Sequence, residues 1–284
     1  MASDIHAHPV DLLRLFPGAE AERRSLGIAC AASAWNGEDF SRHEEMAAAA
    51  RTDGAAPLFP CFALHPQLPA YMIAREKSPA ETAAATVMSV GDFRDKLDLL
   101  EDLAARGRLA AVGETGFDLY SAEFRETEAI QDDLFAAHLE TALRHDLPLI
   151  LHVRRAMHKI FPHTKALKAL PAAVFHSWPG SPDEGFSLLR RGIRAFFSFG
   201  AAILHNHKNA VLSCTALPAE QILLETDAPY QPLRGREFSS WADLSVILRS
   251  AAAIRKESGK PGGEPEELEN ITDGNFFSIL MRAQ

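Results

Sequence analysis

Short apolar runs recur along the chain, and each ends in polar residues before a longer segment with helical periodicity. Small and β-branched residues are common in these runs, as is typical of buried parallel strands. The runs extend from Ala2 to His8, Leu26 to Ser33, Leu58 to His65, Leu109 to Gly116, Leu147 to Val153, Ala172 to Ser177, Ile193 to Gly200 and Ile222 to Ala228. The pattern therefore predicts eight strands that alternate with helices.

The segments between the runs are amphipathic. One presents a single apolar helical face, made of Phe93, Leu97, Leu100 and Ala104, and Gly107 supplies a stop signal. The segment Arg125 to His145 repeats the pattern through Ile130, Leu134, Ala137 and Thr141. The alanine-rich stretches Met46–Ala50 and Thr82–Ala85 also favour helix, whereas KESGKPGGEPEE is typical of a flexible loop before a closing helix.

Eight strand-then-helix units in 284 residues fit a (β/α)8 TIM barrel, for which about 250 residues are typical. An open doubly wound sheet is the main alternative that the same alternation allows. Hydrophobic residues make up 47% of the chain, which is enough for one large core. We expect a single α/β domain that spans residues 1–284.

Composition and charge bear on the cellular location, the state of the cysteines and the kind of partner. No apolar run reaches the roughly 18 residues of a membrane span, and the N-terminal region lacks a signal-peptide pattern, so we expect a cytoplasmic protein without a membrane partner. The cysteines Cys30, Cys61 and Cys214 have no CxxC spacing and are expected to be buried thiols. The formal net charge of −9 disfavours a protein that grips long duplexes through its overall field. A phosphate substrate would be held locally, by metal ions and a few arginines.

Residues of the metal-ligand type stand where the predicted strands end. In a barrel, the carboxyl ends of the strands converge on one mouth. The residues at this mouth are His6 and His8 of the first run, Glu114 of the fourth, His152 of the fifth, His176 of the sixth and Asp227 of the eighth. For any one of them a polar cap on a strand end is the simpler interpretation. Four histidines and two carboxylates together favour a centre for two divalent ions, with one carboxylate able to bridge them.

Six blocks occur in a fixed order between Ser3 and about Gly235: DIHAHP, VGETGFDLY, PLILHVRRA, VFHSWPGS, FFSFG and LLETDAPYQPLRG. Together they resemble the signature blocks of the TatD family of metal-dependent deoxyribonucleases, within the amidohydrolase-like superfamily, and NITDGNFFSIL resembles that family's closing helix. The resemblance implies that the metal ligands are His6, His8, Glu114, His152, His176 and Asp227, with Glu114 as the bridging carboxylate. It also implies a 3′-5′ exodeoxyribonuclease that acts on single-stranded DNA ends with two divalent ions, Mg, Mn or Zn.

Catalytic and substrate-binding roles follow as hypotheses. We expect Asp227 and Glu114 to be catalytic residues. Asp227 is expected to accept the proton of the attacking water. His65 matches a family histidine that faces the scissile phosphate, although a polar cap on the third strand is an equal alternative. Arg154 and Arg234 are candidate phosphate contacts, although loop arginines are more often solvated.

Other polar and aromatic residues near the strand ends have less specific interpretations. Glu225 is expected to be a packed, hydrogen-bonded carboxylate. Trp178 is a candidate for stacking on a base, although a loop tryptophan more often covers the edge of a core. The pair His205 and His207 lies where the family supplies no ligand, and we expect surface or substrate-loop histidines.

Three blocks depart from the family pattern. Arg155 stands where the family usually has an acidic residue, HSWPGS replaces an HCFSG-like block, and REFSS replaces the usual Asn-Glu-Pro. The ligand set stays whole, but the choice of substrate is left open. The alternatives are a related metallohydrolase that acts on a small ester, lactone or amide, and a non-catalytic metal-binding relative. The sequence leaves the oligomeric state open, a monomer included.

Overall fold

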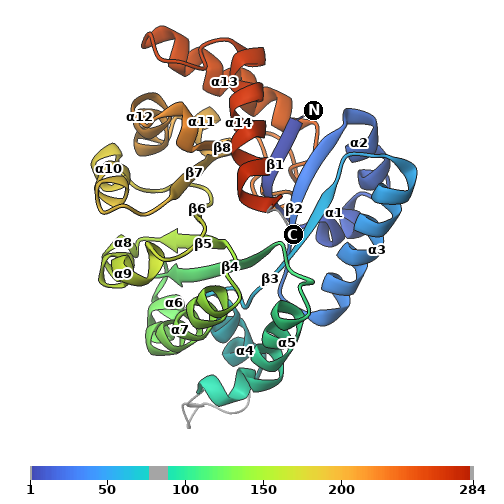
Figure 1. Ribbon diagram of the computed structural model, residues 1–284, viewed down its shortest axis with the longest axis vertical. Coiled ribbons are helices and arrows are strands. Elements are labelled where there is room, and N and C mark those ends of the chain that lie inside the picture. Colours follow the sequence, from blue (N-terminus) through green and yellow to red (C-terminus); the bar gives the residue numbers. More distant parts are fainter. Residues whose placement is uncertain (1, 77–88, 282–284) are drawn as a thin grey trace.

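The computed structural model describes residues 2–76 and 89–281. Within these ranges eight parallel strands form one sheet, in which each strand pairs with the next along the chain (Figure 1). The strands are β1 (Ala2–Ala7), β2 (Ile28–Ala34), β3 (Leu58–Phe62), β4 (Ala111–Asp118), β5 (Leu149–Arg154), β6 (Ala173–Phe175), β7 (Ala195–Phe199) and β8 (Ile222–Leu224). A doubly wound sheet would reverse its strand order at a switch point. The predicted (β/α)8 barrel is therefore confirmed.

Helices follow the strands and lie around the outside of the sheet (Figure 1). The α-helices are α1 (Pro9–Leu15), α2 (Ala19–Leu26), α3 (Gly37–Asp53), α4 (Leu68–Glu76), α5 (Arg94–Ala105), α6 (Ala122–Glu126), α7 (Glu128–Arg144), α8 (Met157–Ile160), α9 (Thr164–Leu167), α10 (Pro182–Arg190), α11 (Ala201–Leu204), α12 (Lys208–Ala216), α13 (Asp243–Glu257) and α14 (Pro265–Leu280). The 3-10 turns are η1 (Val90–Phe93), η2 (Phe161–His163) and η3 (Ala219–Gln221).

The interior of the barrel is a buried cluster to which every strand contributes: Ile5, Ala29, Ala31, Cys61, Ala111, Ile150, Val174, Phe196 and Leu223. Residues from eight strands can meet only inside the closed sheet. Helix α14 lies beside β1 and β8 and covers the end where the strands begin, since the rings of Phe276 and Phe59 lie 5.5 Å apart and Ser3 donates to Asp273 (Figure 1). The other end, where the strands finish, is left for the site.

The barrel closes through the segment after β8 rather than through a β8–β1 ladder. The backbone N–H of Asp227 donates to the carbonyl oxygen of His6 at 3.0 Å. The buried carboxyl of Asp4 accepts hydrogen bonds from the backbone N–H and the hydroxyl of Thr226, at 3.2 and 2.6 Å. The first strand and the last segment are thus joined at the residues that the sequence assigns to the metal centre.

Each predicted apolar run contains a strand, but some bounds differ. Leu26 ends α2 instead of beginning β2, because Gly27 follows it with a left-handed φ of 64° and caps the helix. Strand β4 continues to Asp118, past the predicted end at Gly116. Strand β8 ends early, at Leu224, because the chain then turns toward β1 to close the barrel.

The predicted helical faces are present, with one break. The apolar face before Gly107 buries Phe93, Leu100 and Ala104. The segment predicted as one helix, Arg125 to His145, is two helices, because the hydroxyl of Thr127 bonds to the Phe124 carbonyl at 2.9 Å and separates α6 from α7. Met46–Ala50 lies within α3, whereas Thr82–Ala85 falls outside the described residues.

The remaining expectations about the chain concern the cysteines, the loop before the closing helix and membrane spans. All three cysteines are free and buried, as predicted. The loop before the closing helix occupies residues 258–264, between α13 and α14. Among the helices of the described ranges, none is long and apolar enough to cross a membrane.

A buried histidine of α7 ties together the ends of β3 and β4. The ring of His138 accepts a hydrogen bond from the Leu64 N–H at its Nε2 (3.2 Å), so its Nδ1 carries the proton and donates to the Thr115 hydroxyl (2.6 Å). Leu64 and Thr115 are neighbours of His65 and Glu114 in the sequence. Burial lowers the pKa of His138 to about 3, so the ring stays neutral in the folded protein.

We expect His138→Gln to flatten the pH dependence of stability below neutrality. As the pH falls from about 6 to about 4, the unfolded chain protonates His138 but the folded protein does not, so the free energy of unfolding falls by up to about 1.4 kcal/mol per pH unit. The variant should lack this one-proton contribution in urea unfolding measured across the range. An unchanged slope would contradict a neutral His138.

Candidate metal centre

The six predicted ligands converge at the carboxyl ends of the strands. His6, Glu114 and His152 lie on β1, β4 and β5, and the others follow the ends of their strands. The first predicted run reaches one residue past the strand, because β1 ends at Ala7 and His8 is the N-cap residue of α1. The two rings still lie edge to face, with centroids 4.9 Å apart.

One carboxylate oxygen of Glu114 faces the first strand. Its Oε1 lies 3.2 Å from Nε2 of His6 and 3.2 Å from Nε2 of His8. Asp227 approaches the same two nitrogens from the segment after β8, with its Oδ1 at 3.6 and 3.5 Å. This half of the cluster therefore holds two imidazoles and two carboxylates.

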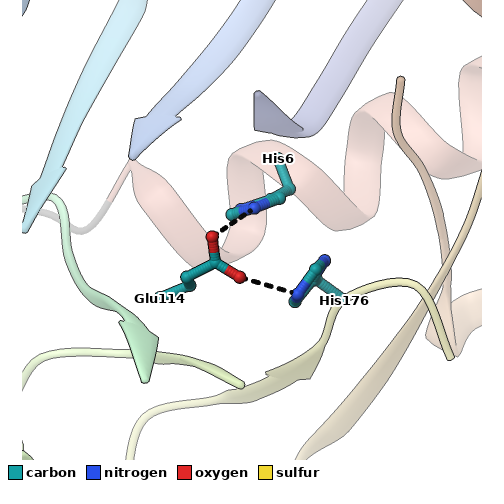
Figure 2. Close-up of side chains that lie close together, drawn as sticks. All are labelled: His6, Glu114 and His176. Atoms are coloured by element: carbon teal, nitrogen blue, oxygen red, sulfur yellow. Dashed lines mark hydrogen bonds and ion pairs between the residues drawn. The ribbon is translucent and has the colours of Figure 1, made fainter. Parts of the chain in front are cut away.

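The other oxygen of Glu114 faces β3, β5 and β6. Its Oε2 lies 2.9 Å from Nε2 of His176, 3.3 Å from Nδ1 of His152 and 3.3 Å from Nε2 of His65. Figure 2 shows the carboxylate between His6 and His176, with one oxygen directed at each ring. Glu114 thus directs one oxygen at each of two adjoining groups of nitrogen atoms, which meet where the ring centroids of His6 and His176 lie 4.1 Å apart.

The charges of the cluster are strongly coupled. Burial alone would raise the pKa of Glu114, but its interactions with the surrounding histidines hold it well below its ordinary value. The pKa of Asp227 is likewise lowered against the effect of burial, chiefly by its hydrogen bond with His8. Burial opposes the charge of His8 too, but hydrogen bonds to Asp227 and Glu114 raise its pKa to about 10. The carboxylates are therefore anionic and attract positive charge.

These donors fit divalent metal ions. Three groups offer ligand atoms within 4.8 Å of one another: His6, His8 and Asp227; His6, Glu114 and His176; and His65, Glu114 and His152. Imidazole nitrogens and carboxylate oxygens are the ligands that Zn and Mn accept in proteins. Every group is buried or half-buried, so the donors are already gathered and partly desolvated.

A hydrogen-bonded chain orients His152. The carboxylate of Asp118 accepts from Nε2 of His152 at 3.1 Å and from the side-chain amide of Gln67 at 2.6 Å. An imidazole that donates from Nε2 to Asp118 has Nδ1, the atom that faces Glu114, as its metal-ligand atom. Burial would raise the pKa of Asp118, but the hydrogen bond from His152 lowers it to about 2. Asp118 is thus the anionic support of this ligand.

The other ligands also have partners behind them. Nδ1 of His6 lies 3.2 Å from the hydroxyl of Ser33, and Oδ2 of Asp227 accepts from the side-chain amide of Gln231 at 2.8 Å. Such contacts fix the orientation of a ligand and its tautomer. They come from β2 and from the loop after β8, so neighbouring elements hold the cluster from several sides.

Glu225 supports His176 through charge. It is fully buried, and its Oε1 lies 3.6 Å from Nδ1 of His176. Within the described residues neither oxygen of Glu225 has a hydrogen-bond partner, so the predicted hydrogen-bonded carboxylate is wrong. The barrel interior next to His176 leaves room for the charge contact but supplies no donor at bonding distance.

His65 differs from the other histidines of the cluster in its tautomer. Its Nδ1 accepts the backbone N–H of Gln67 at 3.1 Å, so the proton of the neutral ring lies on Nε2. That Nε2 faces Glu114 at 3.3 Å. Burial lowers the pKa of His65, which favours the neutral ring. The atom that points into the cluster is therefore an N–H donor.

A cavity of about 1460 Å³ opens over the cluster. Arg154 lines it and lies over the ring of Tyr120, with its guanidinium carbon 3.7 Å from the ring centroid. His205 and His207 line it as well, which agrees with substrate-loop histidines. Arg234 is exposed, and it is not among the described residues that line the cavity.

The structure shows where Arg155 and Trp178 lie, in the two blocks after β5 and β6 that depart from the family pattern. Arg155 turns toward Tyr120, 4.5 Å from the ring centroid, at the residue with a left-handed φ of 56°. The ring of Trp178 is only 1% exposed and packs against Phe175 and Phe197. Trp178 therefore covers the edge of the core, as one of the two interpretations of the sequence predicts. The other interpretation, that its ring stacks on a base, is wrong because the ring is buried.

Sequence reasoning missed the partners of the ligands. Asp118 ends the same strand as Glu114, so the search for carboxylates at strand ends could have found it. Gln67 and Gln231 lie in loops, where no periodicity marks them. Their roles depend on loop geometry, which short-range patterns do not specify.

We expect Asp118→Asn to weaken metal binding by about 10- to 100-fold, because His152 loses the anionic partner that fixes its ring. Isothermal titration of the metal-free protein with Mn²⁺ or Zn²⁺ measures the change. Asp98→Asn, at an exposed position of α5, is the matched control. Equal affinities in the two variants would show that Asp118 does not support the ligand.

Comparisons with known proteins agree with this geometry. The family described as TatD related DNase matches residues 3–281. A "3′-5′ ssDNA/RNA exonuclease TatD" of Dickeya dadantii (strain 3937) is 34% identical over 199 residues, which cover 67% of this chain and 72% of that protein. An "uncharacterized metal-dependent hydrolase TatD" of Mycobacterium tuberculosis is 29% identical over 182 residues, or 62% of this chain and 66% of that protein.

The fold has a solved counterpart. The crystal structure of YjjV, a TatD homologue of Escherichia coli K12, has a TM-score of 0.74 and 23% identity, and the match covers 99% of this chain and 98% of that one. The family match spans nearly the whole chain, and the buried histidines and carboxylates supply the donors for a metal-dependent reaction. The chain belongs to the TatD related DNase family and is a metal-dependent hydrolase.

Proposed function

We propose that this protein is a 3′-5′ exodeoxyribonuclease that hydrolyses phosphodiester bonds at single-stranded DNA ends. Relatives at about 30% identity carry the name 3′-5′ ssDNA/RNA exonuclease, which supports this activity. The observation that carries the proposal is the position of Glu114, whose two oxygens face different sets of candidate ligands. A two-ion site is the usual means of holding both the attacking and the leaving oxygen of a phosphate.

The proposal assigns the donors to two divalent ions. One ion would be held by His6, His8, Asp227 and Oε1 of Glu114, and the other by Oε2 of Glu114, His152 and His176. When bound, such ions lower the pKa of water to about 7 and offset the charge of the phosphate. The imidazoles favour Zn or Mn, whereas carboxylates and phosphate oxygens also accept Mg.

Asp227 is the proposed proton acceptor. Its Oδ1 faces the histidine pair, while Gln231 donates to Oδ2 at 2.8 Å and fixes the orientation of the carboxylate. Asp227 is buried, so its carboxylate meets the attacking water without competition from bulk solvent. As the water oxygen bonds to phosphorus, the proton of the water passes to Asp227, the bond from phosphorus to O3′ of the remaining strand breaks, and that O3′ takes up a proton to become a hydroxyl.

His65 and Arg154 are the proposed phosphate contacts. The Nε2–H of His65 points into the cluster and can donate to a phosphate oxygen, a role that the lone pair of His152 cannot fill. Arg154 lies at the end of β5 with its guanidinium held over Tyr120, which pre-orients a two-pronged donor. Arg234 is proposed as an outer contact for a longer strand, since Gln231 of the same loop lines the cavity.

The size of the cavity favours a nucleic acid over a small ester, lactone or amide. At about 1460 Å³ it exceeds the roughly 300–1,000 Å³ that small ligands occupy. The overall charge of −9 means that the strand must be held by these local contacts. An extended single strand can enter such a mouth end first.

Asp227→Asn should abolish most of the nuclease activity while the fold persists. Removal of a general base costs about 10²- to 10⁴-fold in rate. We would digest end-labelled single-stranded DNA with Mg²⁺ or Mn²⁺, using wild type, Asp227→Asn and the control Asp98→Asn, all purified in parallel. Stepwise shortening by wild type and Asp98→Asn is the expected result.

Two outcomes oppose the proposal. Equal shortening by all three proteins would indicate a contaminating nuclease or a different base. No shortening by any of them would favour a metallohydrolase of small esters, lactones or amides, or a non-catalytic metal-binding protein. A panel of such substrates separates these two alternatives.

A further inference from the structure

One tryptophan is placed differently from the other two. Trp178 and Trp241 are each 1% exposed, whereas Trp35 is 39% exposed and lines the cavity over the cluster. An indole that stays exposed in the wall of a cavity is available to contact a flat ligand there. The indole of Trp35 therefore offers a free aromatic surface at the site.

The backbone holds this ring firmly. Strand β2 ends at Ala34 and α3 begins at Gly37, so Trp35 lies in a connection of two residues. Asn36, the other residue of that connection, caps α3 by accepting the Asp39 N–H at 2.9 Å. The backbone that carries the ring is therefore fixed at both ends, by a barrel strand and by a capped helix.

Trp35 is also close to the reacting centre along the chain. Ser33, two residues earlier, bonds Nδ1 of the ligand His6 at 3.2 Å. Two residues of extended chain span roughly 7 Å. That length is comparable with the separation of phosphate and base within one nucleotide.

The cavity has two chemically different sides. The side after β2 and β3 carries Trp35 with Leu68, Tyr71 and Met72, and the ammonium of Lys96 lies 5.4 Å from the centroid of the indole ring. The side after β5 and β7 carries polar and basic residues, Arg154, His205, His207 and Lys208. In an eight-stranded barrel β7 lies across from β3, so the metal cluster stands between the two sides.

We propose that Trp35 is the stacking platform for the base of a nucleotide that flanks the scissile phosphodiester. The inference rests on the proposed nuclease function and adds the part of the substrate that the apolar side binds. Every base has a flat π face, so an indole binds a base with little regard to sequence. The Lys96 ammonium lies over one face of the ring, which leaves the other face for the base and places a positive charge near a ligand that carries phosphate.

A binding experiment tests the subsite without any hydrolysis. We would titrate the protein with dAMP and, separately, with deoxyribose 5-phosphate, and follow tryptophan emission. Trp35 dominates the solvent-exposed emission because the other two tryptophans are buried. We expect dAMP to quench the tryptophan emission and deoxyribose 5-phosphate to leave it unchanged. In Trp35→Phe the quenching by dAMP should be lost. Equal quenching by the base-free compound, or quenching that persists in Trp35→Phe, would overturn the proposal.

A kinetic experiment then uses oligonucleotides with an abasic residue at the last or the penultimate 3′ position. Loss of the stacked base should lower kcat/KM of the wild type by about 5- to 150-fold at one of the two positions, the size of a base–aromatic stack. Trp35→Ala should show the same loss on the intact strand and no further loss on the abasic strand, while Trp35→Phe should retain most of the activity.

The outcomes separate this proposal from the proposed function. Efficient digestion that is equally fast in Trp35→Ala and wild type would overturn the stacking platform and leave the nuclease standing. Base-dependent quenching by dAMP without any digestion would support the base subsite and remove the exonuclease assignment. Metal content measured on each variant shows that the cluster is intact.

Discussion

The buried carboxylate of Glu114 is the constraint on which the site depends. An anion withdrawn from water is costly unless charges and hydrogen bonds compensate it. Here both oxygens are surrounded by imidazoles within 3.3 Å, which arrive from strands that are far apart in the sequence. A closed parallel barrel brings such strand ends to one point, so closure of the barrel also gathers the side chains of the site.

The closure of the barrel and the assembly of the cluster use the same residues. The Asp227 N–H completes the ring of strands on the carbonyl of His6, and both side chains enter the cluster. Glycine permits the close approach of β4 and β5, because a Cβ at Gly116 would lie 2.1 Å from the carbonyl oxygen of His152. Changes that loosen these contacts would therefore displace ligands as well as strands.

Much of the fold, and the convergence of the six candidate ligands, could be predicted from the sequence, because both depend on short-range patterns. The apolar runs carry His6, Glu114 and Asp227 near their ends, so one pattern indicates both the strands and the positions where they finish. The break at Thr127 and the position of His8 beyond β1 depend on single hydrogen bonds and on the point where a strand stops, which periodicity does not encode. The exposed Trp35 in the cavity depends on tertiary placement, which no spacing signals.

The number of metal ions that each chain binds shows whether Glu114 joins two sites into one centre. We infer that one carboxylate, Glu114, joins two groups of nitrogen ligands into one centre. Titration of metal-free protein with Mn²⁺, followed by calorimetry and by elemental analysis of the washed complex, gives the stoichiometry. We expect two ions per chain in the wild type and weaker binding at both sites in Glu114→Gln. A single ion in the wild type, or two tightly held ions in Glu114→Gln, would contradict this inference.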